Sequence, residues 1–147
     1  MKKIGVIFTF LVITAMMMTS CGKYEEGPGF SLRTKTARLT GEWKLVEITE
    51  NGTAMDISDM EATYEFERGG DMKVSTKWMG MTFSFEGEWR FDDSKENLEV
   101  RIKEEGTEWS EWESTEILRL TNGELWLRDE FTEEGETYTE IMKFEKQ

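Results

Sequence analysis

The stretch Gly41-Glu42-Trp43-Lys44-Leu45-Val46-Glu47-Ile48 decides the fold of this chain. It concentrates aromatic, aliphatic and β-branched side chains in a short run, which is typical of a β-strand. Gly41 opens the run, and Asn51-Gly52 closes it with a turn signal. We therefore take this stretch as the first strand of a folded domain that continues with further strands of the same kind.

The residues upstream have the organisation of a secretory leader. Lys2-Lys3 form a charged start, and the apolar run over 4–18 is too short to span a bilayer comfortably. Small residues before the only cysteine, Cys21, resemble the lipobox of bacterial lipoproteins. The resemblance implies a signal peptide over 1–20, an acyl anchor such as palmitate on Cys21, and attachment to the bacterial outer membrane. The alternative is an ordinary secretory leader followed by a free cysteine.

The segment between the cysteine and the first strand divides into a tether and a helix. Residues 21–30 surround the only proline with glycines, which indicates a flexible tether. Its acidic pair Glu25-Glu26 resembles a signal that sends some Bacteroidota lipoproteins to the cell surface. Over 31–39, Ser31 is a candidate cap, and Leu32 and Leu39 share one helical face. A short helix is predicted there, and we expect the folded domain to cover 31–147.

Downstream, apolar and polar residues alternate with period two, and short turns separate the runs. The longest alternation extends from Met81 to Phe91. Because loop length fixes which residues of a hairpin face each other, three cross-strand pairs can be predicted. They are Phe66 with Met72, Trp78 with Met81, and Phe91 with Leu98.

These runs predict an all-β domain of eight strands. A flat sheet of that size would expose one entire apolar side, whereas a closed barrel buries that side and removes both edges. We predict an eight-stranded antiparallel up-and-down barrel with a short N-terminal helix. The alternative is a two-sheet β-sandwich.

Gly41-Glu42-Trp43, the basic helical segment before it and the meander after it together resemble the lipocalin-like lipoproteins of Bacteroidota. The resemblance runs from about residue 27 to residue 146. It implies that Trp43, with Gly41, packs across the closed end of the barrel. Lipocalins place an arginine in the last strand, where this chain offers Lys143 and Lys146, with Arg128 as a possible substitute.

Composition argues against several functional classes. The 147 residues include 31 acidic and 18 basic residues, for a net charge of −13, and removal of the leader makes the chain more negative still. Such a surface repels phosphate backbones, so nucleic acid is not an expected partner. Histidine is absent, and the sequence has no nucleophile elbow, metal-ligand cluster or glycine-rich phosphate loop. We expect no enzymatic activity, no metal site and no cofactor.

The first functional hypothesis is a barrel that binds a small, largely apolar molecule. The candidate lining residues are Trp78, Phe83, Phe85, Trp89, Trp112 and Tyr138. The alternative is that these residues only fill the core. In that case the domain is a structural or protein-interaction module of the outer envelope, and Trp109 and Trp112 are the candidate anchors for an envelope protein partner.

The late hairpins predict a polar section inside the barrel. If Asn122-Gly123 and Glu134-Gly135 are two-residue turns, Leu118 pairs with Leu127 and a row of carboxylates follows. The row comprises Glu116, Asp129 and Glu140. We expect it to lie in water or to receive a cationic group of the ligand. The alternative is that a bulge turns part of the row outward, or that the row lies at the open rim.

Overall fold

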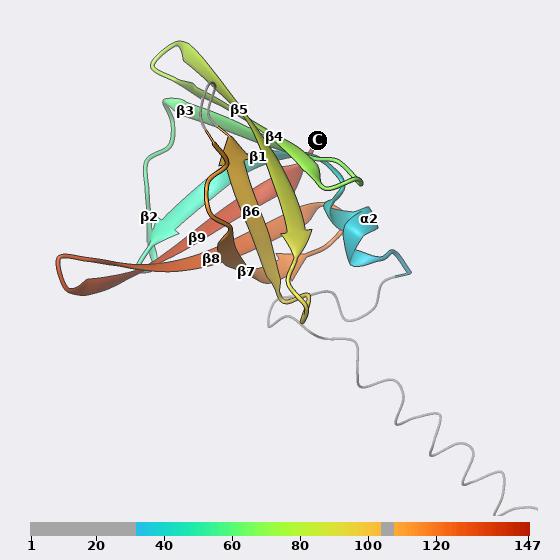
Figure 1. Ribbon diagram of the computed structural model, residues 1–147. Helices are drawn as coiled ribbons and strands as arrows, with labels where there is room; N and C mark the ends of the chain where they lie inside the picture. Colours follow the sequence, from blue (N-terminus) through green and yellow to red (C-terminus); the bar gives the residue numbers. More distant parts are fainter. Residues whose placement is uncertain (1–31, 104–107) are drawn as a thin grey trace, which may run out of the picture.

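A computed structural model of the protein describes residues 32–103 and 108–147. The described chain forms one short helix, α2 (Lys35–Leu39), and nine strands (Figure 1). The strands are β1 (Gly41–Glu50), β2 (Thr53–Ala54), β3 (Met60–Phe66), β4 (Asp71–Trp78), β5 (Met81–Phe91), β6 (Asn97–Lys103), β7 (Glu113–Leu120), β8 (Glu124–Glu133) and β9 (Glu136–Lys146).

Eight of these strands form a closed antiparallel barrel. From β3 to β9 each strand pairs with the next, and β1 joins β3 on one side and β9 on the other. The two-residue strand β2 lies outside this ring and pairs only with the end of β1. The predicted eight-stranded up-and-down barrel is therefore confirmed, and its topology is lipocalin-like rather than that of a two-sheet sandwich.

The early hairpins have the predicted registers. Phe66 faces Met72, Trp78 faces Met81, and Phe91 faces Leu98. The prediction for β7 and β8 is right only at the turn, where Leu120 faces Leu125. A register shift between Ile117 and Arg119 then places Ile117, instead of Leu118, opposite Leu127.

The helix is shorter than predicted. Thr34 caps it, because its hydroxyl oxygen accepts a 3.2 Å hydrogen bond from the backbone N–H of Ala37. Ser31, the predicted cap, lies outside the described residues. Leu32 precedes the helix and is 91% exposed, so it does not share a buried face with Leu39.

Trp43 packs beneath α2 and closes one end of the barrel. Its side chain is fully buried, and its indole N–H donates a 2.7 Å hydrogen bond to the Leu39 carbonyl oxygen. Of the basic residues considered for the place of the lipocalin arginine, Lys146 lies over the Trp43 ring, with its ammonium nitrogen 5.0 Å from the ring centroid. The same ammonium group donates to the carbonyl oxygens of Arg38 (2.8 Å) and Thr40 (2.6 Å), which ties the last strand to the helix.

Gly41 is required by this arrangement. Its φ of 129° is unfavourable for other residues, and a Cβ atom there would lie 2.7 Å from Cε of Lys146. Lys143 and Arg128, the other two basic residues considered for this place over Trp43, face outward. Lys143 pairs with Glu47, and Arg128 pairs with Glu116.

The half of the barrel next to α2 is filled by side chains. Every second residue of each strand points inward, so large apolar groups from several strands meet there. The largest fully buried side chains are Trp43, Phe66, Phe144, Leu39, Leu98, Ile117, Leu120 and Leu125.

Gly87 offers a test of this packing. A Cβ atom at Gly87 would lie 2.8 Å from the Arg101 carbonyl oxygen and 2.8 Å from Cγ of Met72, so Gly87→Ala should destabilise the fold by about 1–3 kcal/mol in urea unfolding. Gly123→Ala is the control, because nothing lies within 4 Å of a Cβ atom there. Equal stability of the two variants would contradict the close packing around Gly87.

Candidate binding site at the open end of the barrel

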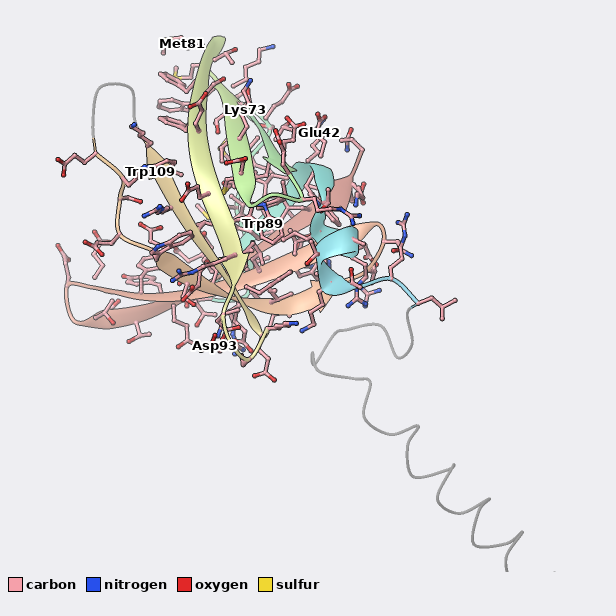
Figure 2. The ribbon with its side chains drawn as sticks, turned by 45° about the vertical axis from the view of Figure 1, so that its right-hand side comes forward. Glu42, Lys73, Met81, Trp89, Asp93 and Trp109 are labelled. Atoms are coloured by element: carbon pink, nitrogen blue, oxygen red, sulfur yellow. The ribbon has the colours of Figure 1, made fainter. Side chains whose placement is uncertain are left out.

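The end of the barrel opposite α2 is framed by two long hairpins. The β4–β5 and β8–β9 hairpins extend away from the body of the barrel in different directions (Figure 1). Strand β5 runs the full height of the molecule, with Met81 at this end and Asp93, in the loop after β5, at the other (Figure 2).

An apolar cavity of about 360 Å³ lies on the inner wall of β3, β4 and β5. It is lined by Met60, Thr76, Trp78, Phe83 and Phe85. Strand pairing explains this grouping, because Thr76 faces Phe83 and Trp78 faces Met60 across neighbouring strands. Inward positions of adjacent strands form rows on a sheet, so the five side chains share one surface.

The lining is unusually accessible for large apolar side chains. Trp78 is 52% exposed and Phe83 is 43% exposed, and the neighbouring Met81 is 54% exposed. Single exposed apolar residues are ordinary on a protein surface, but a contiguous group of them marks an interaction site.

The opposite inner wall carries three carboxylates in a row. Glu140 on β9 faces Asp129 on β8 and Glu50 on β1. One step deeper, Met142 of β9 faces Leu127 and Ile48 on the same two strands. Because side chains two residues apart point to the same face, the carboxylates share the inner face with these apolar residues.

The members of this row change the pKa of Glu140. Partial burial, and then the negative charges of Asp129 and Glu50, raise the pKa of Glu140 above its ordinary value. Burial and the charge of Glu140 likewise raise the pKa of the Tyr64 hydroxyl group. Tyr64 belongs to the row that continues through Val74 to Phe85, so the acidic wall lies close to the apolar wall.

The predicted carboxylate row is wrong for Glu116. The bulge in β7 places Glu116 opposite Arg128, and the two side chains form an ion pair on the outer face. The predicted pair of Asp129 and Glu140 is confirmed. Closure of the barrel brings Glu50 to the other side of Glu140, so the row exists but has a different third member.

Of the predicted aromatic lining, Trp78, Phe83 and Phe85 meet at the cavity, whereas Trp89 belongs to the core. Trp89 is 6% exposed, and its indole N–H donates a 2.9 Å hydrogen bond to the Glu67 carbonyl oxygen. Its ring packs edge to face against Phe66 and Phe91. Trp89 is therefore a core residue and does not line the cavity.

Trp112 does not face the interior. Its ring lies on the outer wall, 4.1 Å from the Arg90 guanidinium carbon and 4.7 Å from that of Arg101. The Trp109 ring also stacks on Arg101, with its centroid 4.8 Å from the guanidinium carbon, and Figure 2 shows Trp109 beside β6. Both rings therefore contact outward-pointing arginines of β5 and β6. The pairing of β6 with β7 ends at Val100, just before Arg101.

Tyr138 lies further out, on the β8–β9 hairpin. Its ring stacks on Phe131 with centroids 5.5 Å apart and an interplanar angle of 15°. Phe131 is 38% exposed. The pair is therefore next to the carboxylate row, two residues along each strand from Asp129 and Glu140.

Sequence reasoning missed Met60, Tyr64 and Glu50 as members of this site. Tyr64 and Met60 follow from the alternation of β3, so that signal was present in the sequence. Glu50 could not be found in this way, because a bulge between Leu45 and Glu47 shifts the register between the first and last strands.

The carboxylate row does not have the geometry of a metal site. Within residues 32–103 and 108–147, no group of three or more His, Cys, Asp or Glu side chains is arranged to hold a metal ion. Carboxylates that face one another across strands without a metal must share protons, contact water or meet another positive group.

Comparison with known proteins gives likeness in structure alone. No protein-family model and no curated protein matches the sequence. An odorant-binding protein from bovine nasal mucosa is 15% identical, with 80% of this chain and 77% of that chain covered and a TM-score of 0.47. Aphrodisin, a sex pheromone from female hamster, is 11% identical over 74% of this chain and 75% of its own, with a TM-score of 0.44.

Apocrustacyanin C2 is 13% identical, with 75% of this chain and 61% of that chain covered and a TM-score of 0.47. Likeness at this level carries no information about ligands, and the fold is established by the strand pairing itself.

The raised pKa of Glu140 predicts how stability depends on pH. The folded state binds this proton more tightly than the unfolded state, so the contribution of Glu140 to stability falls as pH rises above 4.5. Glu140→Gln should therefore stabilise the fold at pH 7, by roughly 0.5 kcal/mol, and have less effect at pH 4. Thermal unfolding at both pH values measures this difference.

Glu130→Gln is the matched control, since Glu130 is exposed and points outward beside Asp129. The change in stability caused by Glu140→Gln could be the same at both pH values, or equal to that caused by Glu130→Gln. Either result would show that the carboxylates of the row do not repel one another.

Proposed function

We propose that this protein binds a small, largely apolar molecule in the open half of its barrel. The observation that carries the proposal is the apolar cavity of about 360 Å³ lined by Trp78, Phe83 and Phe85. Small-molecule sites in proteins have volumes of roughly 300–1,000 Å³ and are lined mainly by apolar and aromatic groups. Because side chains fill the end under α2, a ligand would enter from the end framed by the two hairpins.

The exposed side chains of the cavity supply the driving force. Each 100 Å² of apolar surface removed from water contributes about 2.5 kcal/mol. Part of this gain is lost when the ligand is immobilised. The affinity of a ligand that covers Trp78 and Phe83 is therefore set by the apolar area that it covers, less this cost.

A protein-interaction module is the second candidate, and the exposed ring of Trp109 is the observation that favours it. Trp109 and Trp112 already stack on the barrel's own arginines, and Arg101 also pairs with Glu88. A partner that used these rings would have to compete with contacts that the free protein already makes. The ligand-binding proposal requires no such competition.

We also propose that the protein is a lipid-anchored lipoprotein of the bacterial outer membrane, exposed at the cell surface. The support is the lipobox-like sequence ending at Cys21 and the acidic pair Glu25-Glu26, which lie outside the described residues. Within residues 32–103 and 108–147, no helix is long and apolar enough to cross a membrane.

Binding of the neutral fluorescent probe N-phenyl-1-naphthylamine tests the ligand proposal. The probe should bind the wild type, and Trp78→Ser or Phe83→Ser should weaken binding about tenfold, because each removes apolar contact area from the cavity. Val46→Ser is the control, since Val46 is 41% exposed and does not line the cavity. Absence of probe binding, or equal loss in all three variants, would contradict the proposal.

Anchoring is tested by Cys21→Ala. We expect the variant to leave the membrane fraction and to lose metabolic labelling with a fatty acid, because the thiol is the acylation site. Continued labelling of the variant would show that Cys21 is not the anchor.

A further inference from the structure

The open half of the barrel places an apolar wall and an acidic wall around one space. The apolar wall is the β3–β5 cavity with Trp78 and Phe83, and the acidic wall is the row of Asp129, Glu140 and Glu50. From this juxtaposition we infer that the ligand is a cationic amphiphile, with an apolar tail on the β3–β5 wall and an amine or quaternary ammonium head at the carboxylate row. The inference rests on the proposed ligand-binding function and specifies its ligand class.

In the part of the chain that the structure describes, no basic side chain is paired with the row inside the barrel. Five ion pairs between described residues lie on the outer face, where outward-pointing residues of neighbouring strands meet. On the inner face, Lys146 is the basic residue of the described strands, and it is held at the closed end by the Arg38 and Thr40 carbonyl oxygens. The negative charge of Glu140 and its two neighbours is therefore uncompensated by the described side chains.

A bound cation would relieve a repulsion that the free protein contains. Glu140 lies between Asp129 and Glu50 in direct cross-strand pairing, and like charges placed opposite each other are unfavourable. The arrangement of the three groups does not suit a metal ion. An ammonium head is larger, needs no fixed coordination geometry, and can contact several carboxylates at once.

The aromatic pair beside the row suits such a head. Phe131 and Tyr138 stack on each other one step further out on the same two strands. Cations bind over aromatic faces, and quaternary ammonium groups are recognised in this way. Carboxylates and aromatic rings that adjoin in one place are the two groups that recognise an organic cation.

The side chain of Tyr64 lies between the two walls. Tyr64 connects them, because its ring packs edge to face on Phe144 of β9, with centroids 5.0 Å apart, and its strand leads through Val74 to Phe85. Phe144 and Glu140 belong to the same inward row of β9. Because burial and then the charge of Glu140 raise the pKa of the Tyr64 hydroxyl group, we place the head of the ligand on the Tyr64 side of the carboxylate row.

Displacement of N-phenyl-1-naphthylamine by three decyl compounds tests the inference. The compounds are decyltrimethylammonium, decyl sulfate and decanol, each kept below its micelle concentration. For the wild type we expect decyltrimethylammonium to bind about tenfold more tightly than decyl sulfate. Because partly exposed charges are screened by salt, this preference should shrink as the salt concentration rises.

The variant Asp129→Asn with Glu140→Gln should bring the two charged compounds to within about threefold of each other, and leave the affinity for decanol unchanged. The variant Glu130→Gln with Glu145→Gln changes the net charge equally on exposed outward residues, and should keep the wild-type preference. This control separates a local contact from attraction by the overall negative charge.

The outcomes distinguish the two proposals. Probe binding that depends on Phe83, combined with equal affinities for the cationic and anionic compounds, would overturn the inference and leave the proposed function standing. A preference that survives Asp129→Asn with Glu140→Gln would overturn it as well. If the wild type does not bind the probe or any decyl compound, the proposed function itself is wrong.

Discussion

The pairing of β1 with β9 is the constraint on which the rest of the structure depends. It converts a meander of strands into a closed barrel, so that one face of every strand turns towards a shared interior. The same pairing brings Lys146 over Trp43 at one end and Glu50 beside Glu140 at the other. The closed end and the acidic wall are thus two consequences of a single strand pairing.

The two halves of the barrel differ because their inward residues differ. Near α2 the strands contribute side chains such as Trp43, Phe66 and Phe144, which interlock and leave no room for a ligand. Towards the hairpins the inward positions hold carboxylates on one side and exposed aromatic groups on the other. Carboxylates cannot fill an apolar core without a partner, so this half stays open and can accept a molecule from outside.

The fold could be predicted from the sequence because its signal is repeated in almost every strand. Alternation with period two gave the strands, and short loops gave registers such as that of Trp78 with Met81. The errors occurred where a single residue changes the register. The bulge before Arg119 turned Glu116 outward, and the bulge after Leu45 hid the position of Glu50. At each bulge two apolar residues are adjacent, Ile117-Leu118 and Leu45-Val46, and the sequence does not say which one keeps the alternation.

The regularity of the strand pattern also decided which aromatic residues were correctly predicted to line the interior. Trp78 and Phe83 lie within regular alternation, and their inward direction followed from it. Trp112 precedes β7 in an irregular segment, where sequence spacing does not fix the direction of a side chain. Its ring contacts the Arg90 guanidinium group on the outer wall.

The indole N–H signals of ¹⁵N-labelled protein during titration with decyltrimethylammonium test the account most directly. Trp78 lies at the cavity, whereas Trp43 and Trp89 are hydrogen-bonded in the filled half, to Leu39 and Glu67 respectively. The account predicts that the Trp78 signal shifts with saturation while the signals of Trp43 and Trp89 stay in place. Shifts confined to the outer-wall residues Trp109 and Trp112, or no saturable shift of Trp78, would contradict it.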